Sequence, residues 1–141
     1  MEGAFKAIIR YLTCEEISNI NKKVLQRTSE INNFSNNLLN ESSLKYAVDV
    51  VKGKIFNKDI YPTLYDKASL YAYSIIRKHI FIDGNKRTGT IVAFSFLEIN
   101  GYTISRMIPD TEIVDVTLNL AEGKKTQKEI SNWLENCYTK L

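Results

Sequence analysis

Residues 79–89, with the sequence HIFIDGNKRTG, combine residue types that bind phosphate groups. Two cations, Lys86 and Arg87, follow a Gly-Asn pair and lead into a long apolar segment. If that segment is a helix, its dipole disfavours both cations by roughly 0.3–1 kcal/mol each near an exposed terminus. A bound phosphate reverses that balance, because unpaired helix N–H groups and both side chains attract it. The spacing predicts an anion site, although two solvated cations explain the same residues about equally well.

Four neighbouring residues bear on this choice. Gly84 permits a positive φ or close approach of a ligand, and Asn85 can donate its amide to a phosphate or simply cap the helix. Asp83, beside an anion site, is suited to hold Mg²⁺, although capping is the simpler role. His79 is the single histidine and precedes Asp83 by four residues, so it can act as general base unless it is structural.

Two other kinds of phosphate-binding site do not fit. Gly84 and Gly89 have the spacing of a P-loop, but Thr90-Ile91 replaces the required Lys-Ser/Thr pair, and the glycines follow a predicted helix. The net charge is only +3, and the cations near the motif form a local patch and not a groove-length stripe. We therefore expect no P-loop and no direct contact with nucleic acid.

Helical periodicity and capping signals predict about six helices that position this motif. They are expected to begin near Thr13, Leu44, Pro62, Asn85, Asp110 and Thr126. Residues 32–40 are predicted to form a loop, residues 53–61 a short hairpin or flap, and residues 102–106 a short strand. In residues 85–99 apolar side chains cover nearly the whole circumference, which predicts a helix buried on all sides. The expected fold is an all-α domain around that central helix.

The composition is that of one soluble domain. The chain has 141 residues, of which 44% are hydrophobic and 25% charged. Cys14 and Cys137 form no CxxC pair, a disulfide between them has no support, and a reducing cytoplasm is the simpler expectation. We find neither a signal-peptide core nor a membrane-length apolar run, so we expect a cytoplasmic protein without membrane contact.

Residues 79–88 closely resemble the signature of the Fic/Doc superfamily, and specifically its death-on-curing (Doc) branch of toxins. Residues 11–16 are similar to the usual opening of these toxins, and residues 61–68 and 96–102 to the segments before and after the motif. The resemblance covers nearly the whole chain from Tyr11. It implies a single Fic/Doc domain at residues 11–141, preceded by an N-terminal extension at residues 1–10.

The resemblance implies an enzyme that uses ATP and Mg²⁺ to transfer part of the nucleotide onto a hydroxyl of a protein. By the family's pattern His79 is the general base, Asp83 is the Mg²⁺ ligand, and Lys86 and Arg87 hold phosphates and act in catalysis. Phe81 is expected to be buried, anchoring the loop of the nucleotide site. The implied nucleotide-binding residues are Phe81, Gly84, Asn85, Lys86 and Arg87.

Two positions bear on which reaction is implied. AMP-transferring Fic enzymes resemble HxFx(D/E)GNGRxxR, whereas this chain has Lys86 at the second glycine and Thr90 at the second arginine. Lys86 fills space that those enzymes leave for phosphates, which implies the reversed nucleotide of a Doc-type kinase acting on an elongation factor Tu-like protein. Gly84 instead matches the adenylylating enzymes, so AMP transfer is the alternative reaction. A non-catalytic Fic-fold binding module is the alternative of a different class.

Toxins of this branch are held inactive by a cognate antitoxin, whose disordered tail folds on the toxin. The resemblance therefore implies an antitoxin partner. We expect restraint from that second polypeptide, and not from a Fic-type inhibitory segment of the pattern (S/T)xxxE(G/N) within this chain.

Overall fold

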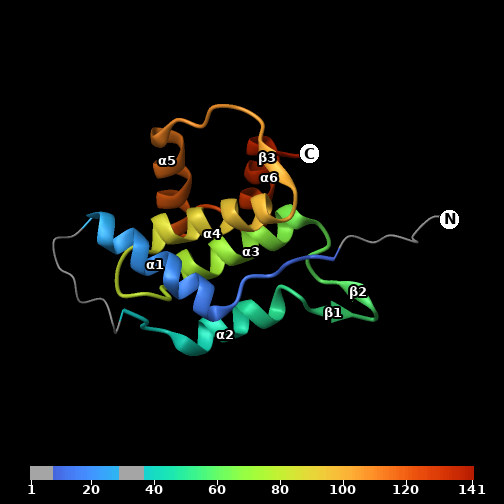
Figure 1. Cartoon of the computed structure of the whole chain (residues 1–141), viewed down its shortest axis with the longest axis horizontal. Coiled ribbons are helices and arrows are strands. Elements are labelled where there is room, and N and C mark those ends of the chain that lie inside the picture. The colour runs from blue at the N-terminus through green and yellow to red at the C-terminus, as the bar shows by residue number, and fades with distance from the viewer. Residues whose placement is uncertain (1–7, 29–36) are drawn as a thin grey trace.

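The computed structural model describes residues 8–28 and 37–141, and six helices and two small antiparallel sheets occur in them (Figure 1). The helices are α1 (Cys14–Thr28), α2 (Glu41–Val50), α3 (Leu64–Arg77), α4 (Asn85–Ile99), α5 (Asp110–Ala121) and α6 (Gln127–Cys137). The strands are β1 (Lys54–Ile55), β2 (Lys58–Asp59), β3 (Tyr102–Ile104) and β4 (Tyr138–Lys140). The prediction of an all-α fold with about six helices is confirmed. Residues 1–7, and residues 32–36 of the predicted loop, lie outside the described part of the chain.

Three helices begin with a complete capping box, in which side chain and backbone satisfy each other's hydrogen bonds. The pairs are Thr13 with Glu16 in α1, Thr63 with Asp66 in α3, and Thr126 with Glu129 in α6. Three expected starts are shifted. The helix expected from Leu44 begins at Glu41, because Asn40 caps it. Pro62 precedes the N-cap of α3, because Thr63 and Asp66 fix that start, and Pro109 rather than Asp110 is the N-cap of α5.

The helices α3 and α4 pack most extensively against each other and lie between the other four (Figure 1). The pair α1 and α2 covers one side, and α5 and α6 cover the other. Tyr71 of α3 meets Phe96 of α4 with ring centroids 5.2 Å apart, and both side chains are buried. The prediction that α4 is the central helix is confirmed.

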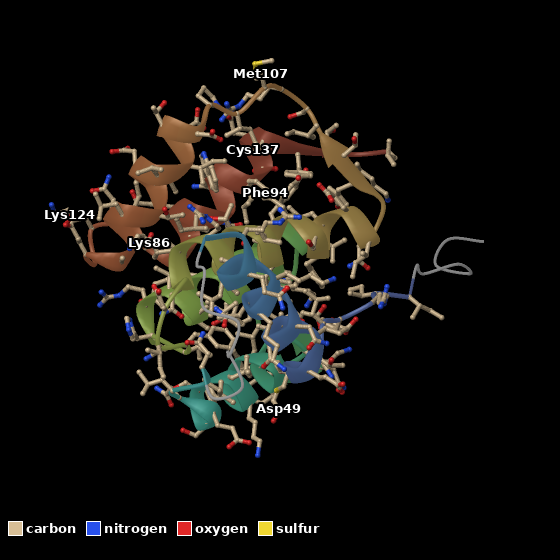
Figure 2. All side chains as sticks on the ribbon, turned by 60° about the vertical axis from the view of Figure 1, so that its left-hand side comes forward. Asp49, Lys86, Phe94, Met107, Lys124 and Cys137 are labelled. Carbon is tan, nitrogen blue, oxygen red and sulfur yellow. The ribbon has the colours of Figure 1, made fainter. Side chains whose placement is uncertain are left out.

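The expectation that α4 is buried on all sides is wrong. Val92, Ala93 and Phe96 are buried in the core, but Lys86 and Arg87 are exposed, and Ile91 and Phe94 are only partly buried. The sequence pattern could not distinguish a side chain that packs in the core from one that lines an open cavity. Figure 2 shows Lys86 and Phe94 on the part of α4 that faces the two C-terminal helices.

The two sheets are small, and Tyr138 of β4 is buried in the core. Strands β1 and β2 form the expected hairpin, whose turn residues Phe56 and Asn57 have φ values of 50° and 63°. Strand β3 was expected, and it pairs with β4, where the sequence indicated no strand. In the described residues no helix is long and apolar enough to cross a membrane, and Cys14 and Cys137 are free thiols.

Candidate active site

The motif begins where α3 ends, at His79. His79 adopts a left-handed conformation with φ 51°, and the next residue, Ile80, donates its N–H to the carbonyl of Ile75 at 3.3 Å. His79 follows the C-cap Lys78, at the position after a helix where glycine is usual, since a left-handed conformation strains other residues. The imidazole is exposed, and no hydrogen bond or ion pair joins it to another residue of the described chain. Histidine therefore occupies this strained position although its side chain makes no hydrogen bond or ion pair within the described chain.

Residues 37–40 hold the next part of the motif loop in place by backbone hydrogen bonds. Leu38 forms a bridge with Phe81, and Ile82 donates its N–H to the carbonyl of Asn37 at 2.8 Å. The carbonyl of Ile80 accepts from the N–H groups of residues 39 and 40 at 2.8 and 2.9 Å. Phe81 is 1% exposed, so its side chain anchors the loop in the core. The loop is fixed by chain far from it in sequence.

The side chain of Asn85 closes the same loop from the other end. Its Oδ1 accepts from the Phe81 N–H at 2.9 Å, and its Nδ2 donates to the Phe81 carbonyl at 2.7 Å. Asn85 is the first residue of α4, and the N-cap is Gly84, so the simple capping role considered for Asn85 is wrong. Its amide holds the loop, because one N–H and the oxygen are already bonded to Phe81.

The N-terminus of α4 differs from the other helix starts of the described chain. Gly84 has φ 79°, and no side chain caps the helix. The first turn carries Lys86 and Arg87 and no acid, whereas every other described helix has an acidic residue in its first turn. No ion pair joins Lys86 or Arg87 to a carboxylate of residues 8–28 or 37–141. Unpaired N–H groups and two free cations thus converge at one helix end, which is suited to an anion.

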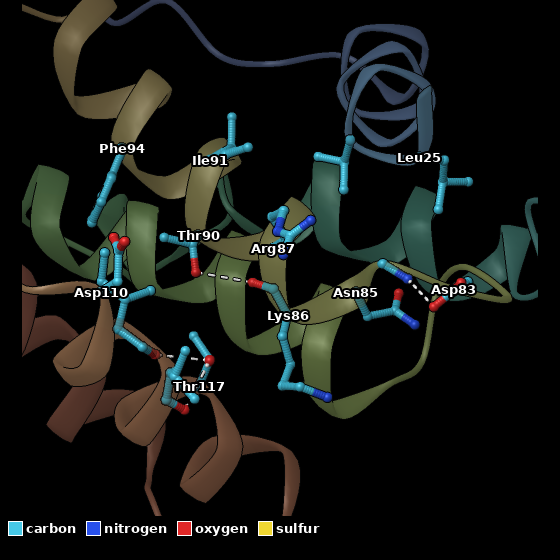
Figure 3. Close-up of a pocket in the computed structure, with 14 residues that line it drawn as sticks. Leu25, Asp83, Asn85, Lys86, Arg87, Thr90, Ile91, Phe94, Asp110 and Thr117 are labelled. Carbon is cyan, nitrogen blue, oxygen red and sulfur yellow. Dashed lines mark hydrogen bonds between the residues drawn. The ribbon is translucent and has the colours of Figure 1, made fainter. Parts of the chain in front are cut away.

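This helix end opens on a cavity of about 810 Å³ between α1, α4 and α5 (Figure 3). Its polar end carries the motif residues, and its apolar wall is built by side chains of all three helices. Figure 3 shows Lys86 and Arg87 extending from α4 in opposite directions. The lining residues are Val24, Leu25, Asp83, Gly84, Asn85, Lys86, Arg87, Thr90, Ile91, Phe94, Asp110, Ile113, Val114 and Thr117. A volume of several hundred cubic ångströms is typical of small-molecule sites.

The structure brings five of the seven predicted site residues together around the cavity. Asp83, Gly84, Asn85, Lys86 and Arg87 line it, whereas Phe81 lies beneath it in the core. His79 is exposed at the end of α3 and is not one of the lining residues. From there the imidazole is open to a macromolecular substrate approaching from solvent.

Asp83 is the one predicted metal ligand. One of its carboxylate oxygens, Oδ1, accepts from the Gly84 N–H at 2.8 Å, and the residue is exposed at the cavity. The described residues contain no cluster of three or more His, Cys, Asp or Glu side chains that could bind a metal by themselves. Mg²⁺ is commonly held by one or two carboxylates together with phosphates and water. A single carboxylate beside an anion site fits that mode of binding.

The α1 and α5 walls of the cavity were missed from the sequence. Val24 and Leu25 follow the apolar stripe of α1, and Ile113, Val114 and Thr117 lie on α5. Only the packing of α1 and α5 beside α4 shows that these side chains share one site.

A Fic-type inhibitory pattern, which we did not expect, does occur in residues 131–136, SNWLEN. The structure gives this segment another role. Ser131 is buried and donates its hydroxyl to Asp66 Oδ1 at 2.6 Å, and none of the six residues lines the cavity. The match gives no support to self-inhibition by α6.

Comparison with known proteins agrees with the motif. The chain is 40% identical over 62 residues to "Toxin Doc" of Mycolicibacterium smegmatis, which covers 44% of this chain and 48% of that protein. It is 31% identical over 75 residues to "Protein kinase doc" of Escherichia phage P1, covering 53% of this chain and 57% of that protein. The chain thus matches about half the length of these curated relatives. The sequence model of the Fic/DOC family matches residues 11–97, more than half of the chain. The chain therefore belongs to the Fic/DOC family.

Proposed function

We propose that this protein is the toxin of a toxin–antitoxin pair and transfers the γ-phosphate of ATP to a hydroxyl of a target protein. The observation that carries the proposal is the N-terminus of α4. It has no side-chain cap, carries Lys86 and Arg87 without carboxylate partners in the described chain, and opens on the cavity. The names of the two relatives, a toxin and a protein kinase, support the same class of activity.

The cavity has room for a nucleotide along α4. From Asn85 to Phe94 the helix rises about 13 Å, at 1.5 Å per residue. Lys86 and Arg87 lie at the Asn85 end of the cavity, whereas Ile91, Phe94 and Ile113 lie toward the other end, together with the carboxylate of Asp110 (Figure 3). We therefore expect triphosphate at the helix end and the base against the apolar wall, a division that matches the polarity of ATP.

Each motif residue then has a physical role. Lys86, Arg87 and the first N–H groups of α4 would hold the phosphates and neutralise charge that develops on them during transfer. Asp83 would hold Mg²⁺, which when bound adds further positive charge at the phosphates. His79 would accept the proton of the target hydroxyl, for which its exposed position suits a protein substrate. Phe81 and Asn85 keep the loop in place.

Lys86 and Thr90 favour phosphate transfer over AMP transfer. Thr90 is 8% exposed and donates its hydroxyl to the Lys86 carbonyl at 2.9 Å, so it supplies no cation where the adenylylating enzymes have arginine. Lys86 supplies its charge one turn earlier, where those enzymes have glycine. Gly84 matches the adenylylating enzymes, and AMP transfer is for that reason the second candidate reaction.

Labelled ATP distinguishes the reactions. The protein is incubated with a lysate of target cells and with ATP carrying ³²P at either the α or the γ position. The kinase proposal expects labelled protein only from γ-labelled ATP, and none with the His79→Ala variant. Label from the α position alone would establish AMP transfer. If neither label is transferred while expression still arrests growth, and does so with His79→Ala, the non-catalytic binding module is supported.

The partners follow from the same proposal. The target is expected to be a translation factor resembling elongation factor Tu, and the partner a cognate antitoxin whose disordered tail orders on the toxin. Such a toxin acts in the cytoplasm, without membrane or direct nucleic acid contact. Identifying the labelled protein from the γ-labelled reaction by mass spectrometry tests the target, and co-purification of a co-expressed neighbouring gene product tests the antitoxin.

A further inference from the structure

Asn21 is a buried amide in the apolar face of α1. It is 1% exposed and lies between Ile17 and Val24, both buried, at helical spacing. A buried amide destabilises the fold unless its donors and acceptor are hydrogen-bonded. Its hydrogen bonds therefore indicate its role. They go to the motif loop, to the first turns of α4, and to Asn37, which also contacts the loop.

The two N–H groups of Asn21 bind the junction between the loop and α4. Its Nδ2 donates to the Asp83 carbonyl at 3.0 Å and to Thr88 Oγ1 at 3.1 Å. Its Oδ1 accepts from Asn37 Nδ2, which also lies 3.4 Å from the Asp83 carbonyl. A Cβ at Gly84 would lie 3.4 Å from Asn21 Nδ2, so the loop backbone is close to this amide.

The hydrogen bond to the Asp83 carbonyl fixes a whole peptide plane. The carbonyl of Asp83 and the N–H of Gly84 belong to one planar trans peptide and point in opposite directions. Holding the carbonyl toward α1 therefore turns the Gly84 N–H away from α1. That N–H donates to Asp83 Oδ1 at 2.8 Å, so the carboxylate is oriented in turn.

We propose that Asn21 is a positioning residue that sets the direction of the Asp83 carboxylate and of the N-terminus of α4 through the peptide between Asp83 and Gly84. For the transfer step this inference rests on the proposed function. For the geometry of the loop it does not, because the contacts exist in the protein alone. The ligands affected are Mg²⁺ and a polyphosphate at the helix end.

Asn100 is a matched control at the other end of α4. Its Nδ2 donates to the Phe96 carbonyl at 2.8 Å and to the Arg10 carbonyl at 3.0 Å, and its Oδ1 accepts from the Arg10 N–H at 2.9 Å. It thus ties α4 to the chain just before α1, as Asn21 ties α4 to α1. It lines no part of the cavity. Asn100 is partly exposed and Asn21 is buried, so thermal unfolding of both pairs is compared beside their binding.

The experiment compares Asn21→Asp and Asn21→Ser with Asn100→Asp and Asn100→Ser. Aspartate keeps the shape and the acceptor but loses both donors, and serine removes the amide in case the aspartate variant does not fold. Affinity for inorganic tripolyphosphate is measured by calorimetry with and without Mg²⁺, and thermal unfolding by circular dichroism. We expect the Asn21 variants to bind tripolyphosphate at least tenfold more weakly and to lose the enhancement by Mg²⁺, while the Asn100 variants stay within twofold of the parent.

Hydrogen exchange of the backbone amides gives a readout that needs no ligand. In the Asn21 variants we expect the amides of Gly84 and of Thr88, which donates to the Gly84 carbonyl at 2.8 Å, to exchange at least tenfold faster, with the amides of α6 unchanged. Unchanged exchange at Gly84, or equal loss of tripolyphosphate affinity in both asparagine pairs, would overturn the positioning role. If the parent protein binds tripolyphosphate but transfers no phosphate from γ-labelled ATP, the proposed function fails. The tripolyphosphate affinities and the exchange rates of the variants still decide the role of Asn21. If the parent binds no tripolyphosphate, the exchange rates decide it.

Discussion

The side chain of Asn85 and the backbone of Phe81 form a closed pair of hydrogen bonds across the motif loop. Phe81 donates to Oδ1 at 2.9 Å and accepts from Nδ2 at 2.7 Å, and both residues are buried. Asn85 thereby places the first turn of α4 against the loop that carries Asp83. This contact links the stability of the loop to the geometry of the proposed anion site.

Replacing Asn85 by aspartate should destabilise the protein. The carboxylate keeps the acceptor for the Phe81 N–H but leaves the Phe81 carbonyl without its donor, which costs about 1–3 kcal/mol for a buried group. Urea unfolding at pH 7 measures the change, with Asn132→Ala on the exposed side of α6 as control. A change for Asn85→Asp no larger than the control's would show that this contact does not hold the loop.

Replacing His79 by glycine should leave the protein at least as stable and make it inactive. Relief of the left-handed conformation gains about 1–2 kcal/mol, and the greater freedom of glycine in the unfolded chain offsets about 0.4–1 kcal/mol. His79→Ala keeps the strain and loses the imidazole, so it should be inactive without the gain in stability. Unfolding by urea and transfer from γ-labelled ATP are measured on both variants, and retained transfer by either one would remove His79 from the mechanism.

Replacing Lys86 by glutamine should separate stability from binding. Without ligand, loss of a cation at the positive end of α4 should stabilise the protein by about 0.3–1 kcal/mol. The affinity for ATP-Mg should fall tenfold or more, as expected for loss of one charge-assisted hydrogen bond of about 1.5–3 kcal/mol. Scanning calorimetry measures the stability, and titration calorimetry measures the affinity for ATP-Mg. Lys140→Gln on β4 is the control for the change in net charge. Equal effects of the two variants on ATP affinity would argue against a specific phosphate site at α4.

Acid should unfold this protein partly through Asp66, which joins α3 to α6. Burial raises the pKa of its carboxyl, but hydrogen bonds from Ser131 and Thr63 and the charge of Lys128 outweigh burial and hold that pKa below its ordinary value. The stabilisation is therefore present above the unfolded carboxyl pKa of about 3.9 and is lost as the pH falls through the folded value.

The variant Asp66→Asn tests this assignment. It should lower the free energy of unfolding at pH 7 and reduce its decline below about pH 4, measured by urea unfolding across pH. Asp115→Asn, at an exposed position of α5, should keep the parent's pH dependence. An Asp66→Asn variant with the full acid dependence would place the responsible carboxylates elsewhere.

Local patterns in the sequence predicted the local features of the structure. The capping boxes of α1 and α6 each act within four residues and were read directly, whereas the box of Thr63 and Asp66 in α3 was missed in favour of Pro62. The bounds of α4 and the basic first turn were predicted in the same way, since Gly84 and Gly101 punctuate that segment. The motif is likewise one continuous stretch, which made the family recognisable.

Tertiary structure decided what depends on segments distant in the sequence. Leu25 and Thr117 meet at one cavity only because α1 and α5 pack beside α4, and no spacing along the chain encodes that approach. Asn21 gave a partial signal, as a polar residue in the apolar stripe of α1, but its partner Asp83 lies 62 residues away. The sequence alone determined which residue types stand at the start of α4 and in the loop before it. Packing determined where they point, because the orientation of a side chain or peptide is set by the contacts around it and not by its neighbours in the chain.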